Sequence, residues 1–308
     1  MPIHYDITHT TVYRYNKPVR FGLHRVMFRP RESHDLRVLA TDLQVSPDAS
    51  IRMIQDPHSN SVALVQPIGE AAELRIVCRF TIEREPGSED ELALDPSAEV
   101  LPFAYSVQDR IDLEHYLRPH HDDPEGVLIR WAHQFLQGDQ ESKRTREVLS
   151  RMNAHIGSTL KYEVRNEEGT QTPLETLERG SGSCRDYALL MMEAARRLGI
   201  ATRFVSGYLY DAALDPTEDV GGSEAPVSGA GSTHAWMQAY LPGAGWVAFD
   251  PTNNIMGSHQ LIRVAVARDP AFASPLSGSW FGSADAYLGM EATVAVRRVD
   301  PLAPPSVD

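Results

Sequence analysis

Residues 180–199 read GSGSCRDYALLMMEAARRLG, and this stretch decides how the rest of the sequence is interpreted. A loop rich in Gly and Ser leads into Cys184, apolar residues then recur at helical spacing, and Gly199 is a typical helix stop. Cys184 is therefore predicted to lie in the first turn of a helix. Unpaired N–H groups and the helix dipole favour a thiolate there, and they can also receive an oxyanion. The pattern predicts a nucleophilic cysteine.

A nucleophilic cysteine needs a base, and the base needs a group that orients it. The sequence HAW at 234–236 begins one predicted strand, and FDPTN at 249–253 ends the next. If the two strands pair across the Gly-bearing turn 242–245, His234 and Asp250 lie opposite each other at the open end of the hairpin. The arm that carries His234 is the longer one, so this pairing is expected to need a stagger or a bulge.

The first third of the chain predicts strands. Aromatic and β-branched residues alternate with polar ones over residues 3–15. Similar runs follow at 36–45, 61–66 and 73–83. An antiparallel β-sandwich or barrel is expected over residues 1–85. Residues 86–105 are acidic and carry Pro and Gly, which is typical of an inter-domain linker or an extended strap.

Helical patterns dominate after the linker, and strand patterns return from residue 201. We therefore expect an α+β chain whose second domain spans 106–300 and ends in a tail at 301–308. Residues 211–231 are rich in Asp, Glu, Gly, Ser and Pro. A structureless loop of that length is usually functional, so a lid over the site is expected.

The composition excludes several classes of protein. Of 308 residues, 29 are Lys or Arg and 42 are Asp or Glu, giving a net charge of −13 that argues against nucleic-acid binding. No apolar run is long enough for a transmembrane helix, and the first residues lack the pattern of a secretory signal. The two cysteines, Cys78 and Cys184, form no disulfide framework or zinc motif. A cytoplasmic protein without metal, cofactor or membrane partner is expected.

Four stretches together resemble the transglutaminase-like superfamily, and more narrowly the bacterial transglutaminase-like proteins of the cysteine protease type. They are GSCRDYA at 182–188, GIATRFVSGY at 199–208, HAW at 234–236 and FDPTN at 249–253. The resemblance covers residues 105–270, and the N-terminal strands resemble the β-rich domain that precedes the core in this bacterial group. It implies a papain-like or transglutaminase-like core with a helical part and an antiparallel sheet.

The resemblance places a catalytic triad on Cys184 as nucleophile, His234 as base and Asp250 as the orienting acid. No motif assigns the second oxyanion donor. We place it at Tyr162, which lies in a strand-like patch before the glycine loop.

Two further residues near the motifs have two interpretations each. Asp186 is in the first helical turn, so it is interpreted first as a helix cap and second as a substrate-facing residue. Trp236 is interpreted first as a core residue and second as a substrate-stacking residue.

Together these features predict thiol-dependent acyl transfer on amide bonds of a peptide or protein. Water as acceptor would make the protein a peptidase or amidase, and this outcome is favoured because no acidic pocket for an amine is evident. Two alternatives stay open: a cross-linking transglutaminase that uses an amine acceptor, and a non-catalytic peptide-binding module. The sequence does not predict the oligomeric state.

Overall fold

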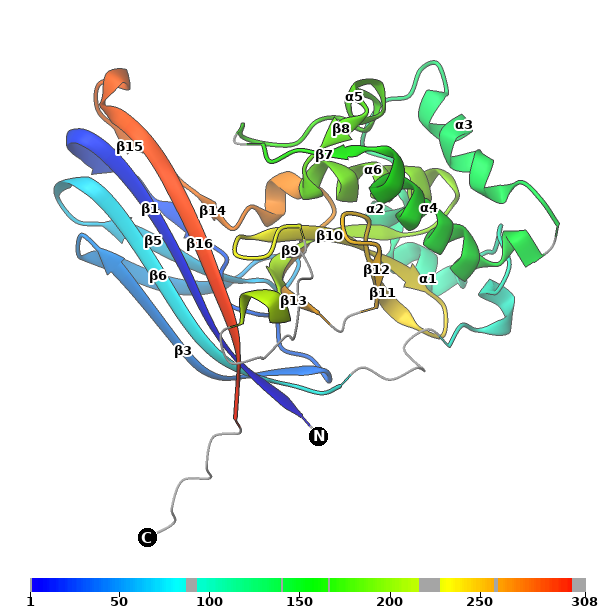
Figure 1. Cartoon of the computed structure of the whole chain (residues 1–308), viewed down its shortest axis with the longest axis horizontal. Helices are drawn as coiled ribbons and strands as arrows, with labels where there is room; N and C mark the ends of the chain where they lie inside the picture. The colour runs from blue at the N-terminus through cyan, green and yellow to red at the C-terminus, as the bar shows by residue number, and fades with distance from the viewer. Residues whose placement is uncertain are drawn as a thin grey trace, which may run out of the picture.

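The computed structural model describes the following residues: 2–86, 93–139, 141–165, 167–215, 228–257 and 260–300. The expected α+β architecture is confirmed. Two antiparallel sheets form one end of the molecule, and a helical layer packed on a third antiparallel sheet forms the other (Figure 1).

Alternation between buried and exposed side chains builds the N-terminal sheets. In β1 (Ile3–Phe21), Tyr5 and Ile7 point into the core while Asp6 between them is exposed. The other N-terminal strands are β2 (His24–Val26), β3 (Leu36–Ser46), β4 (Ala49–Gln55), β5 (Ser61–Pro67) and β6 (Glu70–Arg84). The first sheet has the order β15-β1-β6-β3 with β16 also paired to β1, and the second has the order β14-β2-β5-β4.

The C-terminal strands belong to these N-terminal sheets. They are β14 (Leu276–Ser277), β15 (Trp280–Phe281) and β16 (Tyr287–Val299). β14 pairs with β2, β15 pairs with the end of β1, and β16 runs antiparallel to β1 from His4↔Val299 to Tyr15↔Tyr287. The expectation that the second domain runs to residue 300 is therefore corrected. One edge of the long β1 pairs with β6, and the final strand, β16, pairs with the other edge of β1 instead of with the core sheet.

The helical layer carries most of the remaining elements. Its α-helices are α1 (Val107–Asp112), α2 (Glu114–Leu117), α3 (Val127–His133), α4 (Thr145–Thr159), α5 (Pro173–Arg179) and α6 (Cys184–Arg197). Short 3-10 turns are η2 (Pro96–Ala98), η3 (Gln134–Leu136), η4 (Glu141–Lys143), η5 (Ala212–Leu214), η6 (Pro270–Ala273) and η7 (Ala284–Ala286).

The core sheet has the strand order β12-β11-β10-β9-β13. Its strands are β9 (Thr202–Leu209), β10 (His234–Leu241), β11 (Gly245–Asp250), β12 (Ile255–Met256) and β13 (Leu261–Ala267). A separate two-stranded parallel ladder joins β7 (Lys161–Tyr162) to β8 (Ser181–Gly182). α6 packs on the face of the core sheet that carries Met237, and it is almost entirely buried.

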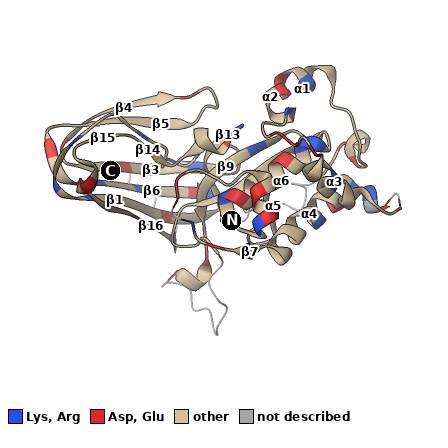
Figure 2. Cartoon of the chain, turned by 90° about the horizontal axis from the view of Figure 1, so that it is seen from above, with Lys and Arg blue, Asp and Glu red and all other residues tan. Residues whose placement is uncertain are grey.

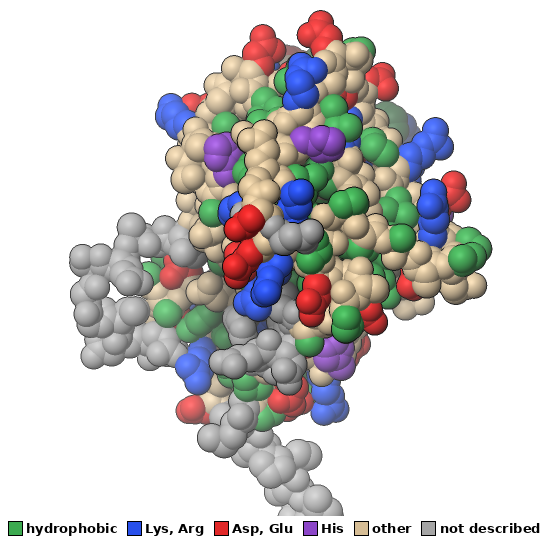
Figure 3. All heavy atoms as spheres, turned by 90° about the vertical axis from the view of Figure 1, so that its right-hand side faces the viewer, with side chains coloured by type: hydrophobic (Ala, Val, Ile, Leu, Met, Phe, Trp, Pro, Cys, Tyr) green, Lys and Arg blue, Asp and Glu red, His purple; other side chains and the backbone are tan. Residues whose placement is uncertain are grey.

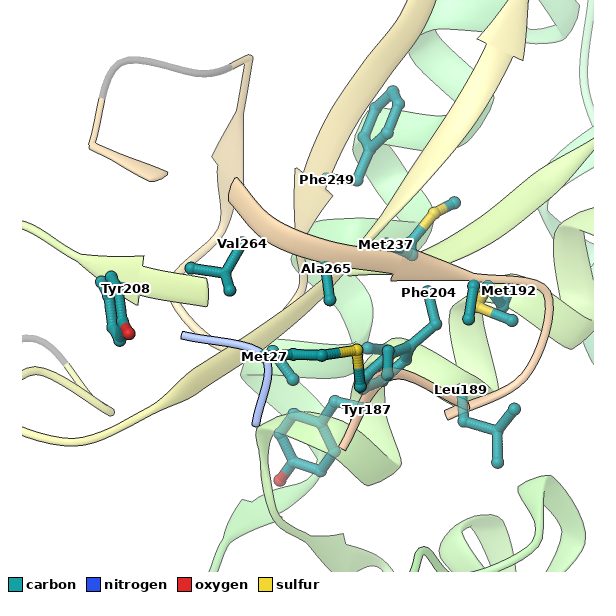
Figure 4. Packing of buried hydrophobic residues seen from close by; sticks show 14 of the residues in the cluster. Met27, Tyr187, Leu189, Met192, Phe204, Tyr208, Met237, Phe249, Val264 and Ala265 are labelled. Atoms are coloured by element: carbon teal, nitrogen blue, oxygen red, sulfur yellow. The ribbon is translucent and has the colours of Figure 1, made fainter. Parts of the chain in front are cut away.

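One continuous apolar cluster holds both ends of the molecule together. Met27 of the N-terminal region lies among Tyr187, Phe204 and Ala265 of the core (Figure 4). A buried polar link crosses the same interface: the hydroxyl of Tyr208 donates to the carbonyl of Phe28 at 2.8 Å. The two ends therefore share a single core.

Residues 93–105, the described part of the expected linker, run in contact with the core. Ala98 is fully buried, and Thr145 donates its hydroxyl to the Ala98 carbonyl at 2.6 Å. Asp95 also donates its backbone N–H to the Pro242 carbonyl at 2.8 Å. Residues 87–92 lie outside the described part of the chain.

Charged side chains of both signs are dispersed over the surface. Figure 2 shows acidic and basic residues along the helices and at the strand ends. Figure 3 shows them interspersed with apolar side chains on the helical end. Among the helices of the described residues, none has the length and apolar character needed to cross a membrane.

Candidate active site

Cys184 is the first residue of α6, as the sequence predicts. Ser183 is the N-cap residue in an extended conformation, and Asp186 three residues later completes a capping box. The Asp186 carboxylate accepts the Ser183 backbone N–H at 2.8 Å and its hydroxyl at 2.7 Å. The thiol is half-buried against the apolar cluster. This cap fixes the chain direction at the cysteine.

Asp186 has no free oxygen for a substrate. Its carboxylate also accepts both Arg165 Nη1, at 2.8 and 3.0 Å, and the Gln171 backbone N–H at 2.7 Å. The side chain is fully buried. This placement favours the capping interpretation over the substrate-facing one.

His234 and Asp250 are brought together by the β10–β11 hairpin. The hairpin keeps a regular register from Leu241↔Gly245 to Met237↔Phe249, so the expected bulge is absent from this pairing. Continuing that register sets Asp250 across from Trp236, which makes its contact with His234 diagonal. His234 and Asp250 are therefore staggered along the two strands, as expected, and the imidazole reaches its diagonal neighbour on the same face of the sheet.

The buried pair is tightly hydrogen-bonded. His234 Nε2 lies 2.8 Å from Asp250 Oδ2, and both side chains are fully buried. Asp250 Oδ2 also accepts Asn253 Nδ2 at 2.9 Å, and Oδ1 accepts the Thr252 backbone N–H at 2.9 Å. Because Nε2 faces a carboxylate it carries the proton, which leaves Nδ1 as the basic nitrogen.

Electrostatics shift both members of the pair towards their charged forms. Burial alone lowers the pKa of His234, but the Asp250 carboxylate and the nearby Cys184 thiol together raise that pKa well above its usual range. Burial raises the pKa of Asp250, and the hydrogen bonds from His234, Asn253 and Thr252 outweigh it, so the pKa of Asp250 is lowered. This environment therefore stabilises an imidazolium at His234 beside a carboxylate at Asp250.

The Cys184 thiol lies close enough to His234 to contribute to that pKa shift. His234 Nδ1 has no hydrogen bond within ordinary limits, and it is the nitrogen that Asp250 does not occupy. Catalytic hydrogen bonds are often long before substrate binds. Nδ1 is therefore the nitrogen of His234 that is left for a contact with the Cys184 thiol.

Tyr162 lies beside the cysteine. The β7–β8 ladder pairs Tyr162 with Gly182, two residues before Cys184. Burial, the neighbouring Cys184 and Asp250, and a hydrogen bond to the Cys184 side chain raise the pKa of Tyr162. The phenol therefore keeps its proton and can donate it as a hydrogen bond at the site.

Trp236 lies inside the protein. Its indole is buried, stacks on the His234 ring at 6.1 Å between centroids, and packs with Val205 and Ala248. This placement favours the core interpretation over substrate stacking. Trp236 supports one face of the imidazole.

The proposed lid lies largely outside the described residues, since 216–227 are not described. The described end of this loop, Ser228–Gly231, lies against the site: a Cβ built on Gly229 would be 2.4 Å from His234 Nδ1.

No group of three or more His, Cys, Asp or Glu side chains that could hold a metal is present in the part of the chain that the structure describes.

The site lies within two matched family models. The model of the transglutaminase-like superfamily matches residues 129–251, which include Cys184, His234 and Asp250. The model of the bacterial transglutaminase-like N-terminal region matches residues 5–83. The two matches place residues 129–251 in the transglutaminase-like superfamily and residues 5–83 in the N-terminal region of its bacterial members. Among relatives of this transglutaminase-like protein are uncharacterized proteins of two mycobacteria. One from Mycobacterium leprae is 25% identical over 283 residues, covering 90% of this chain and 92% of its own. One from Mycobacterium tuberculosis H37Rv is 26% identical over 287 residues, covering 89% and 86%.

A solved structure shares the fold of this transglutaminase-like protein. The crystal structure of a candidate cysteine protease from Cytophaga hutchinsonii superposes with a TM-score of 0.72 at 20% identity. The match covers 99% of this chain and 93% of the other. It therefore extends over the N-terminal sheets as well as the core.

Sequence reasoning gave no role to Asn253 and Gly229. Asn253 was visible in the FDPTN stretch, where an amide that follows the orienting acid is a signal for a hydrogen bond to its carboxylate. Gly229 had no sequence signal, because only the folded loop brings it to His234.

Proposed function

We propose that this protein is a cysteine-dependent acyltransferase that acts on amide bonds of peptides or proteins, with water as its usual acyl acceptor. The observation that carries the proposal is the buried 2.8 Å contact of His234 Nε2 with Asp250 Oδ2, next to the thiol of Cys184. A buried His–Asp pair that leaves Nδ1 facing a helix-terminal thiol is suited to activating sulfur.

In the first half-reaction, His234 Nδ1 holds the proton of Cys184 and the thiolate forms a C–S bond to the amide carbon. The carbonyl electron pair moves to oxygen, and the Cys184 backbone N–H and the Tyr162 hydroxyl stabilise the oxyanion. When the C–N bond breaks, His234 returns the proton to the departing amine and a thioester remains. Asp250 stays ionised and accepts the hydrogen bond from the Nε2–H group of His234.

In the second half-reaction, His234 takes a proton from water while oxygen bonds to the thioester carbon. Collapse breaks the C–S bond, releases the carboxylic acid and restores the cysteine. The carboxylates near the site support water over a lysine amine as acceptor. Glu163 is bonded to Lys161 and Ser181, and Asp186 to Arg165, so neither is free to attract a second cation.

The test is the rate at which iodoacetamide alkylates Cys184, followed by intact mass and peptide mapping. We expect His234→Ala and Asp250→Asn to slow alkylation at pH 6–7 by about tenfold or more. His234→Ala removes the imidazolium that would stabilise the thiolate, and Asp250→Asn removes the carboxylate that keeps that imidazole charged. Cys78 is an internal control, because burial raises its pKa to about 12 and keeps it unreactive. Equal rates in all three proteins would refute the triad.

The acceptor is tested on an unfolded protein substrate such as β-casein. Incubation in ¹⁸O-water with monodansylcadaverine separates the two fates, because hydrolysis incorporates ¹⁸O and transamidation incorporates the dansyl amine. Dansyl incorporation without ¹⁸O would assign the cross-linking activity instead. An activated Cys184 that turns over no amide would favour the peptide-binding module.

A further inference from the structure

The segment Ser228–Gly231, here called the histidine strap, passes directly against the His234 imidazole. Gly229 has φ of +91°, and a Cβ built there would lie 2.4 Å from Nδ1 and 3.1 Å from Cε1 of His234. A side chain would therefore be strained by its backbone and would collide with the ring. A residue without a side chain is therefore needed next to the Nδ1 edge of the imidazole.

Asn253 fixes one end of the histidine strap. Its Nδ2 donates to the Ser228 carbonyl at 3.0 Å, and its Oδ1 accepts the Ser228 backbone N–H at 3.0 Å. The same Nδ2 donates to Asp250 Oδ2 at 2.9 Å. One amide thus binds both backbone groups of the strap and the carboxylate that holds His234.

The N-terminal sheet fixes the other end. The backbone N–H of Val294, in β16, donates to the Gly231 carbonyl at 2.9 Å. β16 is itself paired with β1 along most of its length. The histidine strap is therefore held at Ser228 by Asn253, in the loop after β11, and at Gly231 by β16 of the first sheet.

These contacts confine the imidazole on three sides. Trp236 stacks on its face at an interplanar angle of 27°, Asp250 holds Nε2, and Gly229 lies at the Nδ1 edge. Asn253 bonds directly to Asp250 and to Ser228, the residue that precedes Gly229. Rotation of the ring would move Nδ1 away from the Cys184 sulfur, so an amide that fixes both the carboxylate and the strap acts on the distance that matters for proton transfer.

We propose that Asn253 is a positioning residue for the Cys184–His234 pair, acting through Asp250 and through the histidine strap. The proposal rests on the proposed function, because it assigns His234 the role of base. It also gives the N-terminal sheet a part in the site, since β16 holds the strap in place.

The test compares two variants that disturb this arrangement differently. Asn253→Ala removes the bonds to Asp250 and Ser228. Gly229→Ala keeps those bonds and places a methyl group against Nδ1. The matched control is Asn254→Gly, which removes a neighbouring amide bonded to Asn153 at 3.2 Å while glycine accepts the positive φ of 55° at that position.

The readouts are the pH profile of Cys184 alkylation by iodoacetamide and the thermal midpoint of unfolding. We expect Asn253→Ala and Gly229→Ala to lower the rate at pH 7 by about tenfold and to move the acid limb of the profile to higher pH. Asn254→Gly should stay within about twofold of wild type. A role in folding alone would lower the midpoint without moving the pH profile.

The outcomes separate this inference from the proposed function. Wild-type rates and profiles in Gly229→Ala and Asn253→Ala would overturn the positioning role while leaving the triad intact, provided that His234→Ala still slows alkylation. If Asn253→Ala does not fold, Gly229→Ala alone decides: a wild-type profile overturns the inference, and a shifted one supports it. Unchanged alkylation in His234→Ala would instead overturn the proposed function.

Discussion

The backbones of Tyr162 and Gly182 pair in a two-residue parallel ladder, and this pairing sets the phenol of Tyr162 beside the thiol of Cys184. The ladder includes hydrogen bonds from the Lys161 N–H to the Gly180 carbonyl and from the Glu163 N–H to the Gly182 carbonyl, each at 2.9 Å. A short parallel pair has little stability of its own. Its consequence is positional, since it places a hydrogen-bond donor at the first turn of α6.

Tyr162→Phe should lower kcat for an amide or thioester substrate by about tenfold to a hundredfold, because one oxyanion donor is lost. KM should change little. Alkylation by iodoacetamide forms no oxyanion, so its rate should stay near that of wild type. Steady-state kinetics and alkylation kinetics on the same preparation check this prediction. An equal loss in both assays would mean that Tyr162 acts on the thiol instead.

Asp186→Asn should destabilise the protein by about 2–4 kcal/mol, because Arg165 loses its buried carboxylate and the cap of α6 is weakened. Urea unfolding measures the change. Glu163→Gln is the control: that carboxylate forms a solvent-exposed pair with Lys161, which contributes little to stability. Similar losses in the two variants would contradict the role of Asp186 as a buried cap.

The pair His234–Asp250 should make stability depend on pH. The pKa of His234 is raised in the folded state, so its contribution is fully present below about pH 6.5 and is lost as pH rises towards the folded-state pKa. The difference in unfolding free energy between wild type and Asp250→Asn should therefore be larger at pH 6.5 than at pH 9. It should decline by at most about 1.4 kcal/mol per pH unit. Urea titrations at both pH values test this, and a difference that grows with pH would contradict it.

Tyr208→Phe should lower the free energy of unfolding by about 1–3 kcal/mol, because the Phe28 carbonyl loses its buried donor and His9 Nδ1 loses the hydroxyl that lies 3.0 Å away. Burial lowers the pKa of His9 to about 3, so this loss should be the same at pH 6 and pH 8. Denaturant unfolding at the two pH values measures it. A loss that differs between them would show that His9 is charged in the folded protein.

A chain lacking residues 1–85 should not unfold cooperatively. β14 loses its partner β2, β15 and β16 lose β1, and the shared apolar cluster is opened. Circular dichroism during urea unfolding tests this against the full chain. A sharp transition near the wild-type midpoint would mean that the core is independently stable.

The site was predictable where its signals are local. The cap of Cys184 depends on Ser183 and Asp186 within one turn, and the hairpin that joins His234 to Asp250 depends on one glycine-bearing turn. The register of that hairpin was not predictable, because the diagonal contact is a property of the paired strands. The expected bulge came from counting residues along two arms as if partners had to face each other directly.

The sequence by itself therefore determined the α+β class, the start of the helix at Cys184 and the strand positions of His234 and Asp250. Capping, alternation and turn formation act between near neighbours, so they can be seen in the sequence. Only the tertiary structure decided that β16 completes the first sheet, that Tyr162 lies beside Cys184 and that Asn253 holds the strap against His234. These contacts depend on which sheet edges and backbone groups remain unpaired after the local elements form, and that is a property of the assembled chain.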